Sequence, residues 1–191
     1  MLGRIFIENL LPHRPPFLMV ESIVDYVGGD APILKAERPI RNSEPVFSEI
    51  TPPFYLPSVY IVEGLGQCCN LLSIIWSIEQ IFVAKGNTVE NFDQELMNMV
   101  TNNDDKASDH KLEFFKEDIT KSFSRIGLLA FVDVKIIGKV IAGELLSYKI
   151  QQVKTHGELS HFAVSANVGG QTVAQGTLVG SEGARMEGTV L

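Results

Sequence analysis

The sequence predicts an α+β fold in which one long apolar helix packs against a curved antiparallel sheet. The first observation is the run 58–78, where Glu63 is the only charged residue and apolar side chains fall on almost every helical face. A helix that is apolar all round is buried all round. The second observation is a series of segments in the second half that alternate apolar and polar residues and are separated by glycine turns. Such segments are typical of antiparallel strands, which would wrap the helix in α+β layers.

Length, charge and cysteine content narrow the class of protein. A chain of 191 residues fits one domain of ~100–200 residues. Its net charge of -7, without a basic cluster, argues against a nucleic-acid partner. The run 58–78 approaches the ~20 residues that span a bilayer, but Gln67 and Asn70 interrupt it, so we expect a core helix and no membrane partner. Adjacent Cys68 and Cys69 cannot form an ordinary bridge with each other, which favours reduced thiols in a cytoplasmic protein.

The first half of the chain is expected to contain a short helix, a hairpin, a loop and the long helix. Glycines permit the positive φ of a tight turn, while closely spaced prolines exclude regular structure. In order, the elements are a helical lead-in at 8–11, strands at 17–27 and 33–40 around Gly28-Gly29-Asp30, a proline-dense loop at 45–57, and a helix from about 59 to about 83 with Ser58 as its N-cap.

The second half is expected to contain an acidic insert followed by the sheet. Predicted strands are 128–137, 146–151, 162–168 and 171–179, the last two joined by a Gly169-Gly170 hairpin. The insert 87–121 holds nine acidic residues and four lysines, a net charge of -5, and its spacing predicts one or two short amphipathic helices joined by the loop 101–108. We therefore predict one domain over 1–182 and a flexible tail at 183–191.

Glu63 is the most informative candidate for chemistry. A carboxylate in an apolar helix costs desolvation energy unless it is paired or used. Burial favours the neutral form of a carboxylic acid, which suits a general acid near neutral pH. The alternative is a structural Glu near the helix start, favoured by the helix dipole.

Other candidate sites are weaker. The free N–H groups of Ser58 and Val59 at the helix start form a natural site for an oxyanion or carbonyl oxygen, a feature that every helix start shares. None of the four histidines has ligand spacing with another histidine or cysteine, and His13 is expected to form structural hydrogen bonds. No phosphate-binding loop or dinucleotide fingerprint is present. We therefore expect no metal and no cofactor.

Two stretches resemble a known family. Leu11-Pro12-His13-Arg14-Pro15-Pro16-Phe17-Leu18-Met19-Val20-Glu21 is similar to the N-terminal signature of the hotdog-fold 3-hydroxyacyl-(acyl-carrier-protein) dehydratases. Pro57-Ser58-Val59 and Glu63-Gly64-Leu65-Gly66-Gln67 stand at the spacing of that family's loop and helix motifs, and 140–144 is similar to its later turn. The resemblance covers roughly 8–180 apart from the acidic insert, and it implies a hotdog fold associated as a homodimer or higher oligomer.

The resemblance also implies a reaction and a set of site residues. The family removes water from a (3R)-hydroxyacyl thioester of acyl carrier protein, in fatty-acid or polyketide-type metabolism. A histidine takes the α-proton, a glutamate protonates the departing hydroxyl, and helix-start N–H groups polarise the thioester carbonyl. Here Glu63 corresponds to the glutamate, and the expected substrate-binding residues are Phe54, Ser58, Val59 and Gln67. The substrate would be an acyl thioester of acyl carrier protein or coenzyme A.

The sequence departs from the family where the catalytic histidine stands, because Glu49 occupies that position. One interpretation is an active dehydratase in which Glu49 replaces histidine as the base beside Glu63. A second is a noncatalytic acyl-binding chain, or a subunit that pairs with another hotdog chain supplying the histidine. A third is an acyl thioesterase in which Glu63 activates water. Because the family's carrier proteins are acidic, we expect the acidic insert to cover one side of the molecule or engage another chain.

Overall fold

The computed structural model describes residues 2–101 and 125–184, and it confirms the α+β class. Three α-helices, one 3-10 helix and six strands occur in this part of the chain. They are α1 (Arg4–Leu10), β1 (Ser22–Val27), β2 (Ile33–Pro39), η1 (Pro45–Phe47), α2 (Ser58–Ala84), α3 (Val89–Thr101), β3 (Arg125–Ile136), β4 (Leu145–His156), β5 (Leu159–Val168) and β6 (Gln171–Ala184).

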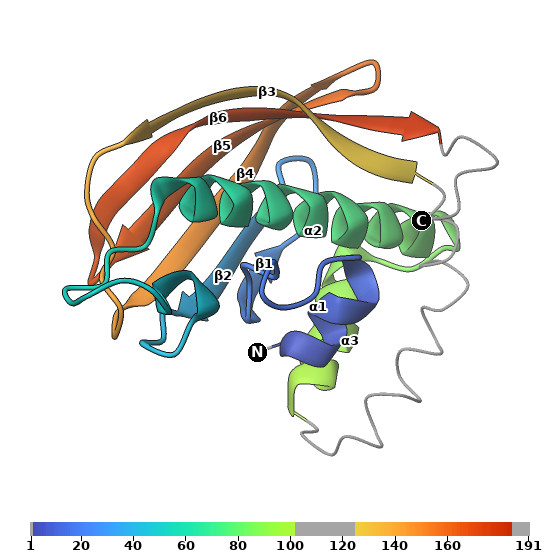
Figure 1. Ribbon diagram of the computed structural model, residues 1–191. Coiled ribbons are helices and arrows are strands. Elements are labelled where there is room, and N and C mark those ends of the chain that lie inside the picture. Colours follow the sequence, from blue (N-terminus) through green and yellow to red (C-terminus); the bar gives the residue numbers. More distant parts are fainter. Residues whose placement is uncertain (1, 102–124, 185–191) are drawn as a thin grey trace.

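The six strands form one antiparallel sheet in the order β1-β2-β4-β5-β6-β3. Figure 1 shows the sheet curving over α2, with α1 and α3 on the opposite side of that helix. The predicted Gly169-Gly170 turn joins β5 to β6, and both glycines have positive φ. Strand β3 precedes β4 in the chain but lies at the far edge of the sheet beside β6, a placement that local sequence patterns do not predict.

The long helix runs one residue beyond each predicted end and carries much of the core. Its buried side chains pack against β-strand residues such as Leu34, Ile150 and Phe162 in one hydrophobic cluster. The expectation that it is buried all round is wrong for this chain, because the sheet covers one side and Val59 stays 65% exposed. By length and composition α2 is the one described helix that could cross a membrane, and 56% of its most apolar stretch is buried inside the structure.

The segment that leads into β1 is not a strand, although the sequence predicted one from Phe17. Strand β1 begins at Ser22, because the backbone of Phe17 and Met19 bonds to the side chain of Gln67 on α2 instead of to a neighbouring strand. The preceding helix α1 also starts earlier than predicted, at Arg4. The N-terminal segment therefore lies across α2 and is tied to it by side-chain hydrogen bonds.

The first part of the acidic insert packs on the core. Helix α3 buries Phe92 and Leu96, and the ring of Phe92 meets those of Tyr26 and Phe82 edge-on, with centroids 6.1 and 5.6 Å apart. These contacts fix α3 beside α2 and the β1–β2 hairpin. The second predicted helix of the insert and most of the loop 101–108 lie outside the described residues. The tail predicted at 183–191 begins too early, because strand β6 continues to Ala184, and 185–191 lie outside the described residues.

The proline-dense loop before α2 is anchored to the connection between β3 and β4. Leu56 N–H donates to Val140 O, and Ala142 N–H donates to Phe54 O, each at 2.9 Å. The ring of Phe54 stacks on that of Phe47 with centroids 5.3 Å apart. One 3-10 turn, η1, forms where the sequence predicted no regular element. These contacts fix the point at which α2 begins.

Candidate functional site

Glu63 lies near the start of α2, on the part of its surface that the sheet does not cover. Val59, Glu63 and Gln67 are spaced by four residues, so they follow one face of the helix. The side chain of Glu63 is 49% exposed, whereas the sequence argument placed it in a buried environment. That expectation fails for the single chain because this face of the helix points away from the sheet. The carboxylate is therefore accessible from outside.

Gln67 holds the carboxylate of Glu63 and is itself buried. Its Nε2 donates to Glu63 Oε1 at 2.8 Å and to Phe17 O at 2.8 Å, and its Oε1 accepts from Met19 N–H at 2.8 Å. Both N–H bonds of the amide and its oxygen are thus engaged, and the side chain has one orientation that satisfies all three partners. Gln67, a predicted substrate contact, thus joins the N-terminal segment to Glu63 in this chain.

His13 is the second ionisable side chain beside Glu63. Its Nε2 lies 3.6 Å from Glu63 Oε1, and its side chain is 31% exposed. The sequence argument assigned His13 a structural hydrogen-bonding role, but its Nδ1 is buried and makes no hydrogen bond with the described residues. Because the two residues are fifty positions apart, no local signal could have paired them.

The helix start carries the remaining predicted substrate contacts. Pro57, not Ser58, is the N-cap, and among the described residues no side-chain hydrogen bond caps the helix start, where Tyr60 N–H donates to Pro57 O at 3.0 Å. Val59 is largely exposed, while Phe54 is half-buried under Phe47. The structure thus places Ser58 and Val59 about one turn before Glu63, and it uses Phe54 to pack the loop.

Glu49 is not joined to Glu63 in this chain. It lies in the exposed turn after η1, next to buried Phe47, and forms no hydrogen bond or ion pair with the described residues. No described contact therefore joins the two carboxylates within this chain, and their pairing stays a prediction.

Beneath Glu63, the helix lies directly on the sheet. A Cβ on Gly64 would come within 2.3 Å of the hydroxyl of buried Tyr148 on β4, so glycine permits this close approach. Burial raises the pKa of the Tyr148 hydroxyl, which keeps it neutral. The absence of a side chain at position 64 therefore lets this turn of α2 pack closely against β4.

A second carboxylate on α2, which sequence reasoning missed, is fully buried. Glu79 Oε2 accepts from the hydroxyl of Tyr26 at 2.7 Å, and its Oε1 accepts from Gly29 N–H at 3.0 Å. Burial and the bond to Glu79 raise the pKa of Tyr26 far above its ordinary range, so the phenol remains a donor. Glu79 is satisfied by the β1–β2 hairpin and has no route to a substrate.

The cysteines are core thiols, as the sequence predicts. Cys68 and Cys69 are both buried and unbridged, and burial raises the pKa of each well above its ordinary value. A neutral, inaccessible thiol is a poor nucleophile or metal ligand. Among the described residues, no group of three or more His, Cys, Asp or Glu side chains is arranged to hold a metal ion.

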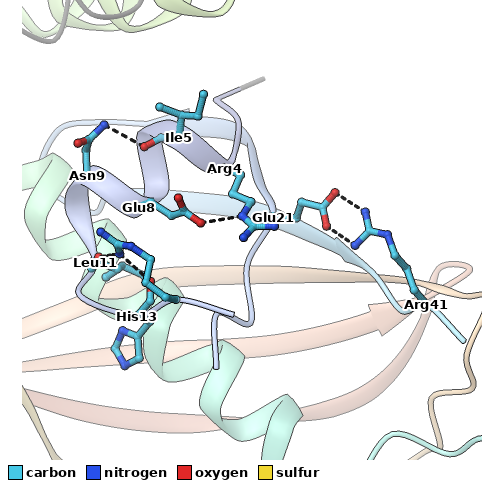
Figure 2. Close-up of polar contacts among 9 residues, drawn as sticks. Arg4, Ile5, Glu8, Asn9, Leu11, His13, Glu21 and Arg41 are labelled. Atoms are coloured by element: carbon cyan, nitrogen blue, oxygen red, sulfur yellow. Dashed lines mark hydrogen bonds and ion pairs between the residues drawn. The ribbon is translucent and has the colours of Figure 1, made fainter. Parts of the chain in front are cut away.

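Two surface depressions lie away from Glu63. One is on the sheet among charged residues such as Lys135 and Lys149. The other lies under α1, where Arg41 donates two bonds to the carboxylate of Glu21 at 2.6 Å and lowers the pKa of Glu21 (Figure 2). Neither depression is lined by Glu63 or His13.

Several known proteins are similar to this chain, although no family model matches it. The 3-hydroxyacyl-(acyl-carrier-protein) dehydratase FabZ of Nitratiruptor sp. is 39% identical over 82 residues, 42% of this chain and 53% of that protein. FabZ of Anaeromyxobacter sp. is 26% identical over 170 residues, 88% of this chain and 82% of that protein. The chain spans about half the length of the first curated relatives that it matches.

A solved structure extends the likeness over nearly the whole chain. The dehydratase heterocomplex ApeI:P from Xenorhabdus doucetiae contains a chain that superposes with a TM-score of 0.58 and 13% identity, covering 94% of this chain and 91% of that one. At this identity the likeness concerns the fold, and it confirms the predicted hotdog architecture, a curved antiparallel sheet around one long helix.

Proposed function

We propose that this chain, a hotdog-fold protein of the 3-hydroxyacyl-(acyl-carrier-protein) dehydratase-like family, acts on (3R)-hydroxyacyl thioesters and promotes the loss of water from them. The observation that carries the proposal is the exposed carboxylate of Glu63, held by Gln67 one turn past an uncapped helix start. The names of the similar FabZ proteins support an acyl thioester of acyl carrier protein as the substrate, with the coenzyme A thioester as an alternative carrier. We place this activity in the cytoplasm.

Glu63 would supply the proton that leaves with the hydroxyl group. Its Oε1 accepts a hydrogen bond from Gln67, which holds the carboxyl group in place for proton donation. The N–H groups of Ser58 and Val59 would polarise the thioester carbonyl, because a helix start attracts partial negative charge. About 6 Å of helix rise separates Val59 from Glu63, a span that suits the carbonyl and the β-hydroxyl of one substrate.

The working unit would contain two hotdog chains, as a homodimer, a higher oligomer or a heteromer. Edge strand β3 exposes large apolar side chains, among them Leu128, Phe131 and Val132, and Phe131 is 55% exposed. An apolar edge strand is prone to pair with another chain. The similar ApeI:P assembly is a dehydratase heterocomplex, which supports pairing between different hotdog chains as one form of this unit.

A noncatalytic or partner-dependent role is the second candidate function. It is favoured by Glu49, which the sequence resemblance aligns with the family's catalytic histidine and which lies exposed without a partner among the described residues of this chain. In this case the chain would bind the acyl group and contribute Glu63, while a second hotdog chain supplies a histidine.

An assay of purified protein with (3R)-hydroxyacyl thioesters of short and medium chain length tests the proposal. We expect enoyl thioester to form, and Glu63→Gln to lower the rate at least ~100-fold because it removes the general acid. Activity unchanged by Glu63→Gln contradicts the proposal. Release of free thiol without enoyl product would assign thioester hydrolysis instead. Activity that appears only with Glu49→His, or only with an added hotdog partner, would favour the second candidate.

A further inference from the structure

The geometry points to His13 as the general base of this site, forming a histidine–carboxylate pair with Glu63 inside one chain. This inference rests on the proposed function, and it names the residue that takes the α-proton. The sequence lacks a histidine at position 49, and the fold brings another histidine to Glu63 from the N-terminal segment.

The loop that carries His13 is held firmly. Helix α1 ends with a bond from Leu11 N–H to Ile7 O at 2.8 Å. The Arg14 guanidinium then donates to the carbonyl oxygens of Leu11 and His13, each at 2.8 Å. Figure 2 shows the imidazole extending from this loop on the side opposite α1. The ring is therefore placed by backbone anchors rather than by its own hydrogen bonds.

Gln67 fixes the loop relative to Glu63. The same amide that donates to Glu63 Oε1 also binds Phe17 O and Met19 N–H, four and six residues after His13. The 3.6 Å separation between His13 Nε2 and Glu63 Oε1 is thus set by a buried side chain. Because Nδ1 is buried, Nε2 is the ring nitrogen that can exchange protons with a ligand.

The electrostatic surroundings suit proton exchange between the two groups. The carboxylate of Glu63 on α2 lies within ion-pair distance of the ring, and the guanidinium of Arg14 on the same loop donates to His13 O at 2.8 Å. An imidazole is a stronger base than a carboxylate, so it removes an α-proton more efficiently. His13 is therefore chemically better suited than Glu49 to be the base.

The reaction balances with these two residues alone. Nε2 of neutral His13 takes the α-proton, and the electrons of that C–H bond form the Cα–Cβ double bond. The Cβ–O bond breaks, and the proton of neutral Glu63 goes to the hydroxyl, which leaves as water. Protonated His13 then returns its proton to the Glu63 carboxylate across the 3.6 Å contact, which restores both starting forms.

The test follows the rate of dehydration and the incorporation of deuterium at Cα in D2O, using (3R)-hydroxybutyryl and (3R)-hydroxydecanoyl thioesters. We expect His13→Gln to lower both at least ~100-fold without lowering the melting temperature. His156→Gln, at the exposed β4–β5 turn, is the matched control and should keep the parent rates. In His13→Ala, added imidazole should restore part of the activity, a rescue that a structural role would not give.

The outcomes separate this inference from the proposed function. If His13→Gln keeps the parent rates while Glu63→Gln loses them, the assignment of His13 is wrong and the proposed function stands. Loss of deuterium incorporation in Glu49→Gln but not in His13→Gln would assign the base to Glu49. If the parent chain alone gives no incorporation, His13 is not a base in this chain. If Glu63→Gln keeps the parent rates, the proposed function fails.

Discussion

Helix α2 carries one glutamate near each end, and the two side chains differ in exposure and in the partners that they contact. Glu63, near the start, is half-exposed and contacts the side chains of Gln67 and His13. Glu79, about four turns later, is fully buried and accepts from Tyr26 and Gly29. The Glu63 carboxylate is accessible for chemistry because the sheet does not cover this end of the helix. The Glu79 carboxylate stabilises the fold because the β1–β2 hairpin covers it.

The difference arises from what lies against the helix at each end. At the Glu79 end, the β1–β2 turn approaches so closely that a Cβ on Gly28 would lie 1.8 Å from the carboxylate. Trp76 Nε1 also donates to Gly29 O at 3.0 Å, so both the N–H and the carbonyl of Gly29 are hydrogen-bonded to side chains of α2. At the Glu63 end, the N-terminal loop reaches the carboxylate through one partly exposed imidazole. The two residues should therefore respond very differently to mutation.

The largest expected effect on stability is that of Glu79→Ala. Removing this carboxylate leaves the Tyr26 hydroxyl and the Gly29 N–H without an acceptor, which should lower the free energy of unfolding by about 3 kcal/mol. The melting temperature should fall by roughly 10 °C. Thermal and urea unfolding measure both quantities.

Glu63→Ala is the matched control for Glu79→Ala, since it removes the same group from the same helix. It should change the free energy of unfolding by no more than about 0.5 kcal/mol, because the Glu63 carboxylate is half in water. Equal losses in the two variants would contradict the contrast between the two ends of α2.

A smaller loss is expected from Gln67→Met, which keeps the shape of the side chain but removes its polar atoms. Met19 N–H and Phe17 O lose their partner, at a cost of about 2 kcal/mol. The amide of Met19 should exchange with solvent faster, as measured by hydrogen exchange. Fast exchange confined to the ends of α2, with Met19 still protected, would show that Gln67 does not tie down the N-terminal segment.

The smallest changes in stability are expected from two carboxylates of α3, and the first of them is Asp93, close to Glu79 at the buried end of α2. Burial, and then the negative charge of Glu79, raise the pKa of Asp93. The folded chain thus binds this proton more tightly than the unfolded chain, so ionised Asp93 destabilises the fold at neutral pH, and the cost disappears as pH falls through the raised pKa. Asp93→Asn should raise the melting temperature slightly at pH 7, and the gain should shrink towards acid pH.

The pKa of Glu90, on the same helix, is shifted in the direction opposite to that of Asp93. Its backbone N–H, and then the Thr88 side chain, lower the pKa of Glu90, so its ionised form favours the fold at neutral pH. Glu90→Gln should therefore lower the melting temperature slightly at pH 7. If both variants had a higher melting temperature at pH 7, the cause would be the lower net negative charge and not the specific environment of Asp93.

Local sequence patterns predicted most of the helices, strands and turns, because these elements are determined by residues close together in the chain. The alternation in β4 and β5, the Gly169-Gly170 turn and the apolar run of α2 each act within a few residues. The position of β3 at the sheet edge was not predictable, since β3 pairs with β6 instead of with its neighbour in the chain. The late start of β1 was missed because Gln67, far along the chain, competes for its backbone.

The candidate site was predictable only in part. The residue pattern pointed to Glu63 and the helix start, and the resemblance to the dehydratases predicted their roles, while burial was inferred for Glu63 and not for Glu79. An apolar run identifies the helix but not the side of it that the sheet covers, so the exposure of Glu63 and the burial of Glu79 depend on tertiary packing. The contact of His13 with Glu63 likewise depends on where the N-terminal loop crosses α2.

The absence of a side chain at Gly64 has a consequence for which substitutions this chain can accept. The Tyr148 side chain fills the space that a methyl group at position 64 would need, so the side chains that fit at these two positions depend on each other. An alanine at 64 would displace either the Tyr148 side chain or this turn of α2. Since Glu63 is the neighbouring residue, a substitution at 64 would move the carboxylate unless Tyr148 gives way.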